Sequence, residues 1–108
     1  MRLVLLATAR GDLKSVARYS EKEWGRARKS QYMAALRARL VALLEHQKLG
    51  IARPDLGAGY RSLLVGSHVV FYRLAASEVR VVRVLHQRMD PKRHLPQPLG
   101  KDRGSAIR

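Results

Sequence analysis

The sequence predicts an α+β fold: strand, helix, helix, strand, strand, strand, with the helical hairpin packed on one face of a small, mainly antiparallel sheet. Three observations lead to this prediction. Val-rich runs separated by short turns fill the last third of the chain, as in antiparallel strands. Apolar residues recur at three- and four-residue steps in the segment before them, as in amphipathic helices. A chain of 108 residues has room for one core, so a single domain is expected.

The first quarter of the chain predicts one short element and one helix. Residues 2–7 form an apolar run, which indicates a buried strand or, alternatively, the start of a helix. Thr8 is a candidate cap for the helix that follows. That helix is expected to run as far as Trp24, because Gly25 is a typical residue just beyond a helix end.

A second helix is expected over residues 26–48, with Gly50 just past its end. So short a break between two helices predicts a hairpin, whose apolar faces need a sheet to cover. The apolar seam that faces this sheet repeats at three- and four-residue steps and consists of Met33, Leu36, Leu40 and Leu43.

The remaining chain predicts three strands and a tail. Residues 49–59 are expected to be irregular, and strands are expected over 60–65, 68–74 and 79–86. Gly66-Ser67 is the tight turn between the first two strands. The second face of the sheet is expected to remain available for a partner. We therefore predict one domain over 1–95 and a flexible, basic C-terminal tail over 96–108.

The charge of the chain predicts an acidic partner. Lys and Arg number 22 against 8 acidic residues, which gives a net charge of +14. Such a chain should associate with nucleic acid, an anionic membrane or an acidic protein, unless the excess is only a solvated basic surface. The chain has no cysteine, which excludes disulfides and thiolate-zinc sites. No apolar run approaches the roughly 20 residues that span a bilayer, so a cytoplasmic protein without membrane contact is expected.

The sequence contains few groups for metal or carboxylate chemistry. The four histidines are scattered, so neither a metal site nor a cofactor is expected. Cleavage of RNA by its own 2′-hydroxyl needs a base, an acid and a cation over the phosphate. Five residues can supply these groups, although the arginines on strands also fit a solvated sheet face. The five are Arg61, Arg83, His86, Arg88 and His94.

Two motifs in the last third resemble a known family. The more specific matches are Gly66-Ser67-His68-Val69-Val70-Phe71-Tyr72-Arg73 and Val82-Arg83-Val84-Leu85-His86-Gln87-Arg88-Met89-Asp90. Weaker matches are Asp12-Leu13, Tyr19, Trp24-Gly25, Tyr32, Leu36 and Gly59-Tyr60-Arg61. Over about residues 2–95 the chain resembles toxins of the RelE/ParE superfamily, and within it the ParE branch.

The resemblance implies the toxin of a bacterial type II toxin–antitoxin pair with the fold predicted above. ParE toxins act on DNA gyrase, whereas RelE relatives cleave mRNA on the ribosome. Arg88 matches a nuclease-type arginine near the end of the last strand, but Val69 stands where those nucleases typically carry another arginine, and His94 stands where a tyrosine is often found. This incomplete set argues against ribonuclease activity. The expectation is therefore a gyrase inhibitor that is not an enzyme and has no catalytic residues. The alternatives are a ribosome-dependent mRNA endonuclease and a non-catalytic, basic nucleic-acid-binding protein.

The resemblance also implies an acidic, ParD-like antitoxin that forms a hetero-oligomer with the toxin. It is expected across the helical hairpin and a sheet edge, around Trp24, Tyr32 and Leu36. DNA contact is expected only indirectly, through the antitoxin or gyrase. The residues expected to meet the target lie at the C-terminal end of the sheet: Arg61, Arg83, His86, Arg88, Asp90 and Arg93, with the segment 91–94.

Overall fold

The computed structural model describes residues 1–95, so the tail predicted over 96–108 lies outside the described residues. The α+β fold and its main element order are confirmed. The elements are β1 (Arg2–Leu5), α1 (Ala7–Trp24), α2 (Arg26–Ala42), β2 (Ile51–Ala52), the 3₁₀ turn η1 (Pro54–Leu56), β3 (Tyr60–Val65), β4 (His68–Ala75), β5 (Glu78–His86) and α3 (Pro91–His94).

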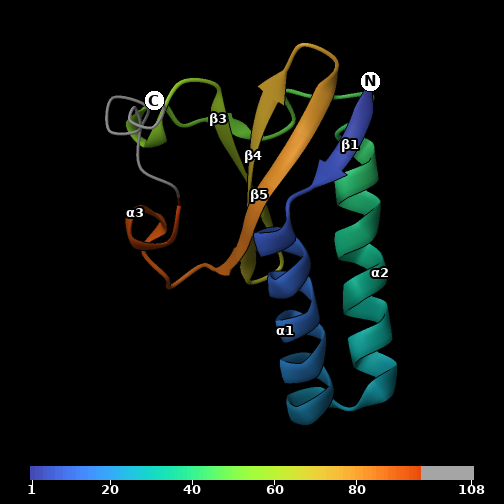
Figure 1. Cartoon of the computed structure of the whole chain (residues 1–108). Coiled ribbons are helices and arrows are strands. Elements are labelled where there is room, and N and C mark those ends of the chain that lie inside the picture. Colours follow the sequence, from blue (N-terminus) through green and yellow to red (C-terminus); the bar gives the residue numbers. More distant parts are fainter. Residues whose placement is uncertain (96–108) are drawn as a thin grey trace.

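The strands form one sheet in the order β1-β5-β4-β3-β2. β1 runs parallel to β5, with Leu3 opposite Val79, and the other pairs are antiparallel. The helical hairpin of α1 and α2 lies against one face of this sheet, and its tip extends past the end of the sheet (Figure 1). β1 lies at one edge of the sheet and β2 at the other.

A two-residue turn at Gly66-Ser67 joins β3 and β4. Gly66 has a φ of +60°, and in the described chain positive φ values occur only at glycines, so the turn has type II′ geometry. The pair Val65 and His68 closes it. Glycine is required here for a second reason, because a Cβ at this position would lie 2.6 Å from the Tyr32 ring on α2.

The main core lies between the helical hairpin and the sheet. The predicted seam of α2 is confirmed, since Leu36, Leu40 and Leu43 are buried and Met33 packs against them. α1 contributes Val16, which is also buried. The sheet supplies residues of one face to the same core, and in β5 a β-bulge around Val82 shifts the alternation by one residue. These core residues are Leu63, Val65, Val70, Tyr72, Val79, Val81 and Val84.

The second face of the sheet is not free, which corrects the sequence prediction. A second cluster of buried side chains covers it, with Leu56 from η1 and Leu95 just after α3 packed over Phe71. The sequence prediction failed because both covering segments are very short. α3 nevertheless has recognisable signals, since Asp90 accepts a hydrogen bond from the Lys92 amide and Pro91 occupies the first helical position.

The second helix ends at Ala42, six residues before its predicted end. At its end the backbone bonds tighten to three-residue steps, with the amides of Leu43, Leu44 and Glu45 donating to the carbonyls of Leu40, Val41 and Ala42. The turns that follow are tied to Tyr72, whose side chain is fully buried. Its hydroxyl donates to the carbonyl of Gln47 at 2.8 Å and accepts from the Gly50 amide at 2.9 Å. These bonds hold the turn between α2 and β2, a short strand in a segment predicted to be irregular. In the described part of the chain, no helix is long and apolar enough to cross a membrane.

Candidate functional site

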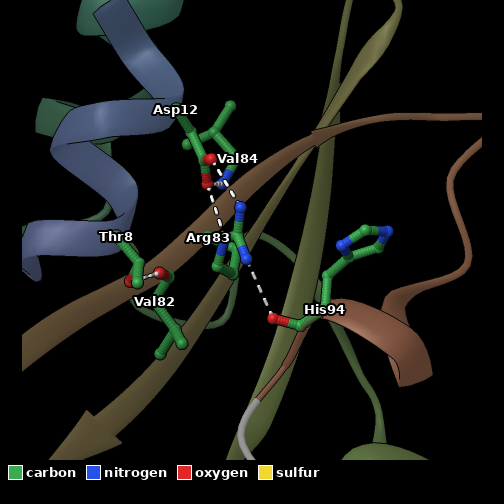
Figure 2. Close-up of polar contacts among 6 residues, drawn as sticks. All are labelled: Thr8, Asp12, Val82, Arg83, Val84 and His94. Atoms are coloured by element: carbon green, nitrogen blue, oxygen red, sulfur yellow. Dashed lines mark hydrogen bonds and ion pairs between the residues drawn. The ribbon is translucent and has the colours of Figure 1, made fainter. Parts of the chain in front are cut away.

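α1 covers an edge of β5 that β1 leaves open. β1 pairs with β5 only as far as Val81. Beyond that point, Thr8 donates its hydroxyl to the Val82 carbonyl at 2.7 Å, and the Asp12 carboxylate accepts from the Val84 amide at 2.9 Å (Figure 2). Thr8 is therefore not the helix cap that the sequence predicted. The N-cap position is Leu6, and the threonine lies four residues before Asp12 on the same side of α1.

Arg83 connects three elements through its guanidinium group. Its Nε and Nη2 donate to the two carboxylate oxygens of Asp12 at 2.8 and 2.7 Å, and its Nη1 donates to the His94 carbonyl at 3.0 Å (Figure 2). The bonds to Asp12 raise the pKa of Arg83 above its ordinary value. An ion pair thus joins α1 to β5, a hydrogen bond from the same guanidinium joins β5 to α3, and Asp12 neutralises the charge of Arg83.

Five rings form a continuous row from the tip of the helical hairpin to the end of β5. Successive ring centroids lie 6.5, 5.7, 5.6 and 5.4 Å apart, and every pair meets edge to face. We call this row the aromatic ladder; its members, in order, are Tyr19, Trp24, Tyr32, His68 and His86.

Tyr32 joins α2 to the turn between β3 and β4. Its hydroxyl accepts from the Ser67 amide at 3.0 Å and lies 2.7 Å from Nδ1 of His68. His68 is only 6% exposed. Burial lowers the pKa of His68 below its ordinary value, and the nearby His86 lowers it further. The lowered pKa of His68 favours its neutral form at pH 7, at the centre of the ladder.

Two hollows flank the aromatic ladder. The first, of about 440 Å³, is lined by Trp24, Arg28, Gln31 and Tyr32. The second, of about 460 Å³, lies between α1 and the end of β5, and Tyr19 and His86 are among its lining residues. The side chains of Trp24 and Tyr19 are 41% and 55% exposed, so both hollows present aromatic surface to a partner.

The structure brings together two of the three residues predicted to bind an antitoxin. Trp24 and Tyr32 lie in ring contact and line the same hollow. Leu36 does not belong to this surface, because its side chain is fully buried in the main core. It supports α2 from the core side, which corrects its place in the predicted set.

The six residues predicted to meet the target do not form one cluster. Arg61, at the start of β3, donates to the carbonyls of Gly50 and Lys48 and lies at the opposite end of the sheet from His86. Arg83 is engaged by Asp12, and its side chain lines a hollow of about 490 Å³ together with Arg93.

The other four predicted target residues lie at the end of β5 or just beyond it. The His86 ring accepts from the Arg88 amide at 3.1 Å, and Asp90 caps α3. Both side chains therefore have local structural roles. Arg88 and Arg93 are exposed, and they remain the best-placed cations of the predicted set for an external contact. Within residues 1–95, no three His, Asp or Glu side chains are placed to hold a metal ion.

Two helices on one face of a mixed five-stranded sheet define this protein as a small α+β domain of a known class. It matches a solved structure titled "Chromosomal ParDE TA system from P. aeruginosa" with a TM-score of 0.70 at 18% identity, over 80% of this chain and 95% of that one. That match establishes the shared fold.

The family follows from the sequence comparisons. A family model described as "ParE toxin of type II toxin-antitoxin system, parDE" matches residues 3–91. The chain belongs to the ParE toxin family of type II toxin–antitoxin systems, which confirms the resemblance noted from its motifs. Toxin ParE1 of Caulobacter vibrioides is 41% identical over 81% of this chain and 90% of its own length. Toxin ParE1 of Mycobacterium tuberculosis is 35% identical over 87% and 97%, and Toxin ParE of Escherichia coli is 33% identical over 81% and 85%.

Proposed function

We propose that this toxin inhibits DNA gyrase by binding it in the bacterial cytoplasm, without bond chemistry of its own. Family membership supports the target. The absence of bond chemistry is supported by one observation: three of the groups that RNA cleavage would need lie apart or already have partners. Arg83 is neutralised by Asp12, Arg61 lies at the far end of the sheet, and His86 accepts a backbone hydrogen bond. Arg61, Arg83 and His86 therefore do not converge as a base, an acid and a free cation.

A paired assay tests this function. Purified toxin should inhibit supercoiling by gyrase and trap cleaved DNA, while mRNA on programmed ribosomes stays intact. Cuts in ribosome-bound mRNA together with unaffected gyrase would reverse the assignment and make the chain a RelE-like nuclease. Both reactions should contain the same toxin preparation, so that a folding defect is not mistaken for target choice.

We propose that Arg88 and Arg93 contact the target. Both are exposed and follow β5, and each offers a forked donor to a carboxylate or phosphate. The double variant Arg88→Gln/Arg93→Gln should lose gyrase inhibition with an unchanged melting temperature and retained antitoxin binding. Arg39→Gln/Lys48→Gln is the matched control, because it removes two other exposed cations. Full inhibition by the Arg88/Arg93 variant would show that this segment only anchors the end of the domain.

We further propose that an acidic, ParD-like antitoxin occupies the aromatic ladder and a neighbouring sheet edge, giving a toxin–antitoxin hetero-oligomer. The exposed rings of Trp24 and Tyr19 offer apolar contact area, and Arg28 beside them offers charge. Aromatic and arginine side chains are the common anchors of protein interfaces. A net charge of +14 should also speed the encounter with an acidic partner.

A further inference from the structure

The outer face of α1 carries an uninterrupted row of four positive charges. The members are four residues apart and all exposed: Arg10, Lys14, Arg18 and Lys22. At a rise of 1.5 Å per residue, the row is about 18 Å long. Along residues 1–95 none of the four forms an ion pair with a carboxylate. We call these four side chains the basic row.

The basic row opposes the stability of the helix that carries it. Like charges four residues apart on a helix repel one another. Arg10 also lies in the first turn of α1, which holds no acidic residue, and there the helix dipole disfavours a positive charge. Of the three acidic residues of α1, Asp12 binds Arg83 and Glu21 binds Lys29 on α2. Glu23 forms no ion pair within the described residues. Arg10 has a partner inside the domain, since its Nε donates to the Leu5 carbonyl at 3.2 Å. Lys14, Arg18 and Lys22 continue the row against local stability, which indicates a use for it outside the domain.

Gly11 gives a second and independent indication. It lies inside α1 one turn from Lys14 and Ser15, and a Cβ placed on it would meet nothing within 4 Å. Packing within the described domain therefore does not require a glycine here, and glycine weakens a helix interior. A small residue beside exposed cations is useful when another molecule must approach the helix backbone closely.

We propose that the outer face of α1 binds the sugar–phosphate backbone of double-stranded DNA. The row is about 18 Å long and turns by about 40° around the helix at each step, so it follows a gentle spiral along α1. Its length matches about five base-pair steps of 3.4 Å, and evenly spaced cations suit a regularly charged, helical polymer. An acidic protein is less well matched, because protein interfaces are anchored by apolar or aromatic side chains. In α1 and α2 the exposed aromatic side chains belong to the aromatic ladder and not to the basic row.

This inference goes beyond gyrase inhibition and differs from the sequence-based expectation that DNA is reached only through the antitoxin or gyrase. A toxin that holds the DNA backbone directly would bind a gyrase–DNA complex more tightly than gyrase alone. Phosphate contacts carry no sequence information, so binding should be indifferent to the base sequence.

The test measures binding of the full chain to a labelled random-sequence DNA duplex by fluorescence anisotropy, without gyrase, at several salt concentrations. Four phosphate contacts predict that log K falls with log salt with a slope of about −3.6. Lys14→Gln/Arg18→Gln should reduce that slope to about −1.8 and weaken binding at least tenfold at about 0.1 M salt. Arg39→Gln/Lys48→Gln, which has the same net charge, should weaken it less than threefold.

Two outcomes of this comparison would overturn the proposal. An equal loss of DNA affinity in both double variants would show that DNA binding depends only on net charge. Polyglutamate serves as the probe for an acidic protein segment. If the Lys14/Arg18 variant loses polyglutamate binding and keeps DNA binding, the row belongs to a protein partner. Because gyrase is absent from these measurements, failure to bind DNA leaves the gyrase proposal intact. Failure to inhibit gyrase likewise leaves the DNA-binding proposal intact.

Gly11 allows a test in which stability and binding should change in opposite directions. Gly11→Leu should raise the thermal midpoint, because leucine favours a helix and meets no neighbour at this position. It should also weaken DNA binding severalfold, because the new side chain stands beside Lys14 where the backbone would approach. A Gly11→Leu variant that binds DNA as tightly as the parent would overturn the proposed docking geometry.

Discussion

The Asp12 carboxylate on α1 holds three donors from β5 at once. Arg83 donates its Nε at 2.8 Å and its Nη2 at 2.7 Å, and the Val84 amide donates at 2.9 Å. One side chain thus replaces the strand partner that β1 does not provide and neutralises the arginine beside it. The pair fixes α1 on the sheet, and through the His94 carbonyl it also fixes α3. The hollow between α1 and β5 and the hollow beside α3 are both bordered by elements that this contact holds in place.

Asp12→Ala is expected to lower the free energy of unfolding by about 2–4 kcal/mol, because it leaves a partly buried guanidinium and a backbone amide without acceptors. The side chains of Asp12 and Arg83 are 13% and 22% exposed, so some of the loss will be recovered by solvent. Urea unfolding measures the effect. Glu21→Ala is the control, since its ion pair with Lys29 is more exposed and should contribute less than about 1 kcal/mol. Equal losses in the two variants would contradict this role for Asp12.

Tyr72→Phe is expected to lower the free energy of unfolding by about 1–3 kcal/mol while leaving the fold unchanged. The hydroxyl is buried and bonds both the Gln47 carbonyl and the Gly50 amide, and phenylalanine leaves both without that partner. Hydrogen exchange should increase first at the Gly50 amide. Tyr19→Phe, at an exposed ring, should have little effect on stability. A Tyr72→Phe variant as stable as the parent would show that water or a backbone shift replaces the hydroxyl.

The elements that could be predicted from sequence are those with strong local periodicity. The Val-rich strands and the seam of Leu36 and Leu40 mark their buried faces directly. The turns that replace the last six predicted residues of α2 were not predictable, because they are tied to Tyr72, which lies 25 residues from its partner Gln47. The ion pair between Asp12 and Arg83 spans 71 residues, and no local pattern signals it. Thr8 and Asp12 are four residues apart on one face of α1, and this spacing is the only local pattern associated with the contact between α1 and β5.

The candidate site was partly predictable. Trp24 and Tyr32 flank a short hairpin tip, so their proximity follows from the connection itself. Arg61 does not lie near the other predicted target residues, and the direction of the strands explains why. In a meander, the first and third strands run the same way, so the start of β3 lies beside the start of β5 and far from His86. That geometry was available from the predicted topology and should have separated Arg61 from the other target residues.

His68 predicts a loss of stability in mild acid. Its pKa is lowered by burial in the folded protein, so below its ordinary value of 6.5 the unfolded chain binds a proton before the folded one does. Its contribution to stability is therefore complete above about pH 6.5 and declines as the pH falls toward the lower folded-state pKa. Urea unfolding between about pH 5 and 8 should show this slope. His68→Gln should flatten it and the exposed His46→Gln should not; matching slopes in the two variants would rule out His68 as the source.

Trp24 provides the sharpest test of the proposed antitoxin surface. Its ring meets both Tyr19 and Tyr32 yet is 41% exposed, so Trp24→Ala should reduce partner contact more than it reduces stability. Truncation of an aromatic anchor typically weakens binding by about 2 kcal/mol, or roughly 30-fold. The antitoxin encoded by the neighbouring reading frame is the ligand, with affinity measured by calorimetry at two salt concentrations. Leu64→Ala removes an exposed apolar side chain on β3, away from the ladder, and should bind as the parent does. Unchanged affinity for Trp24→Ala, with its fold retained, would place the antitoxin on another surface.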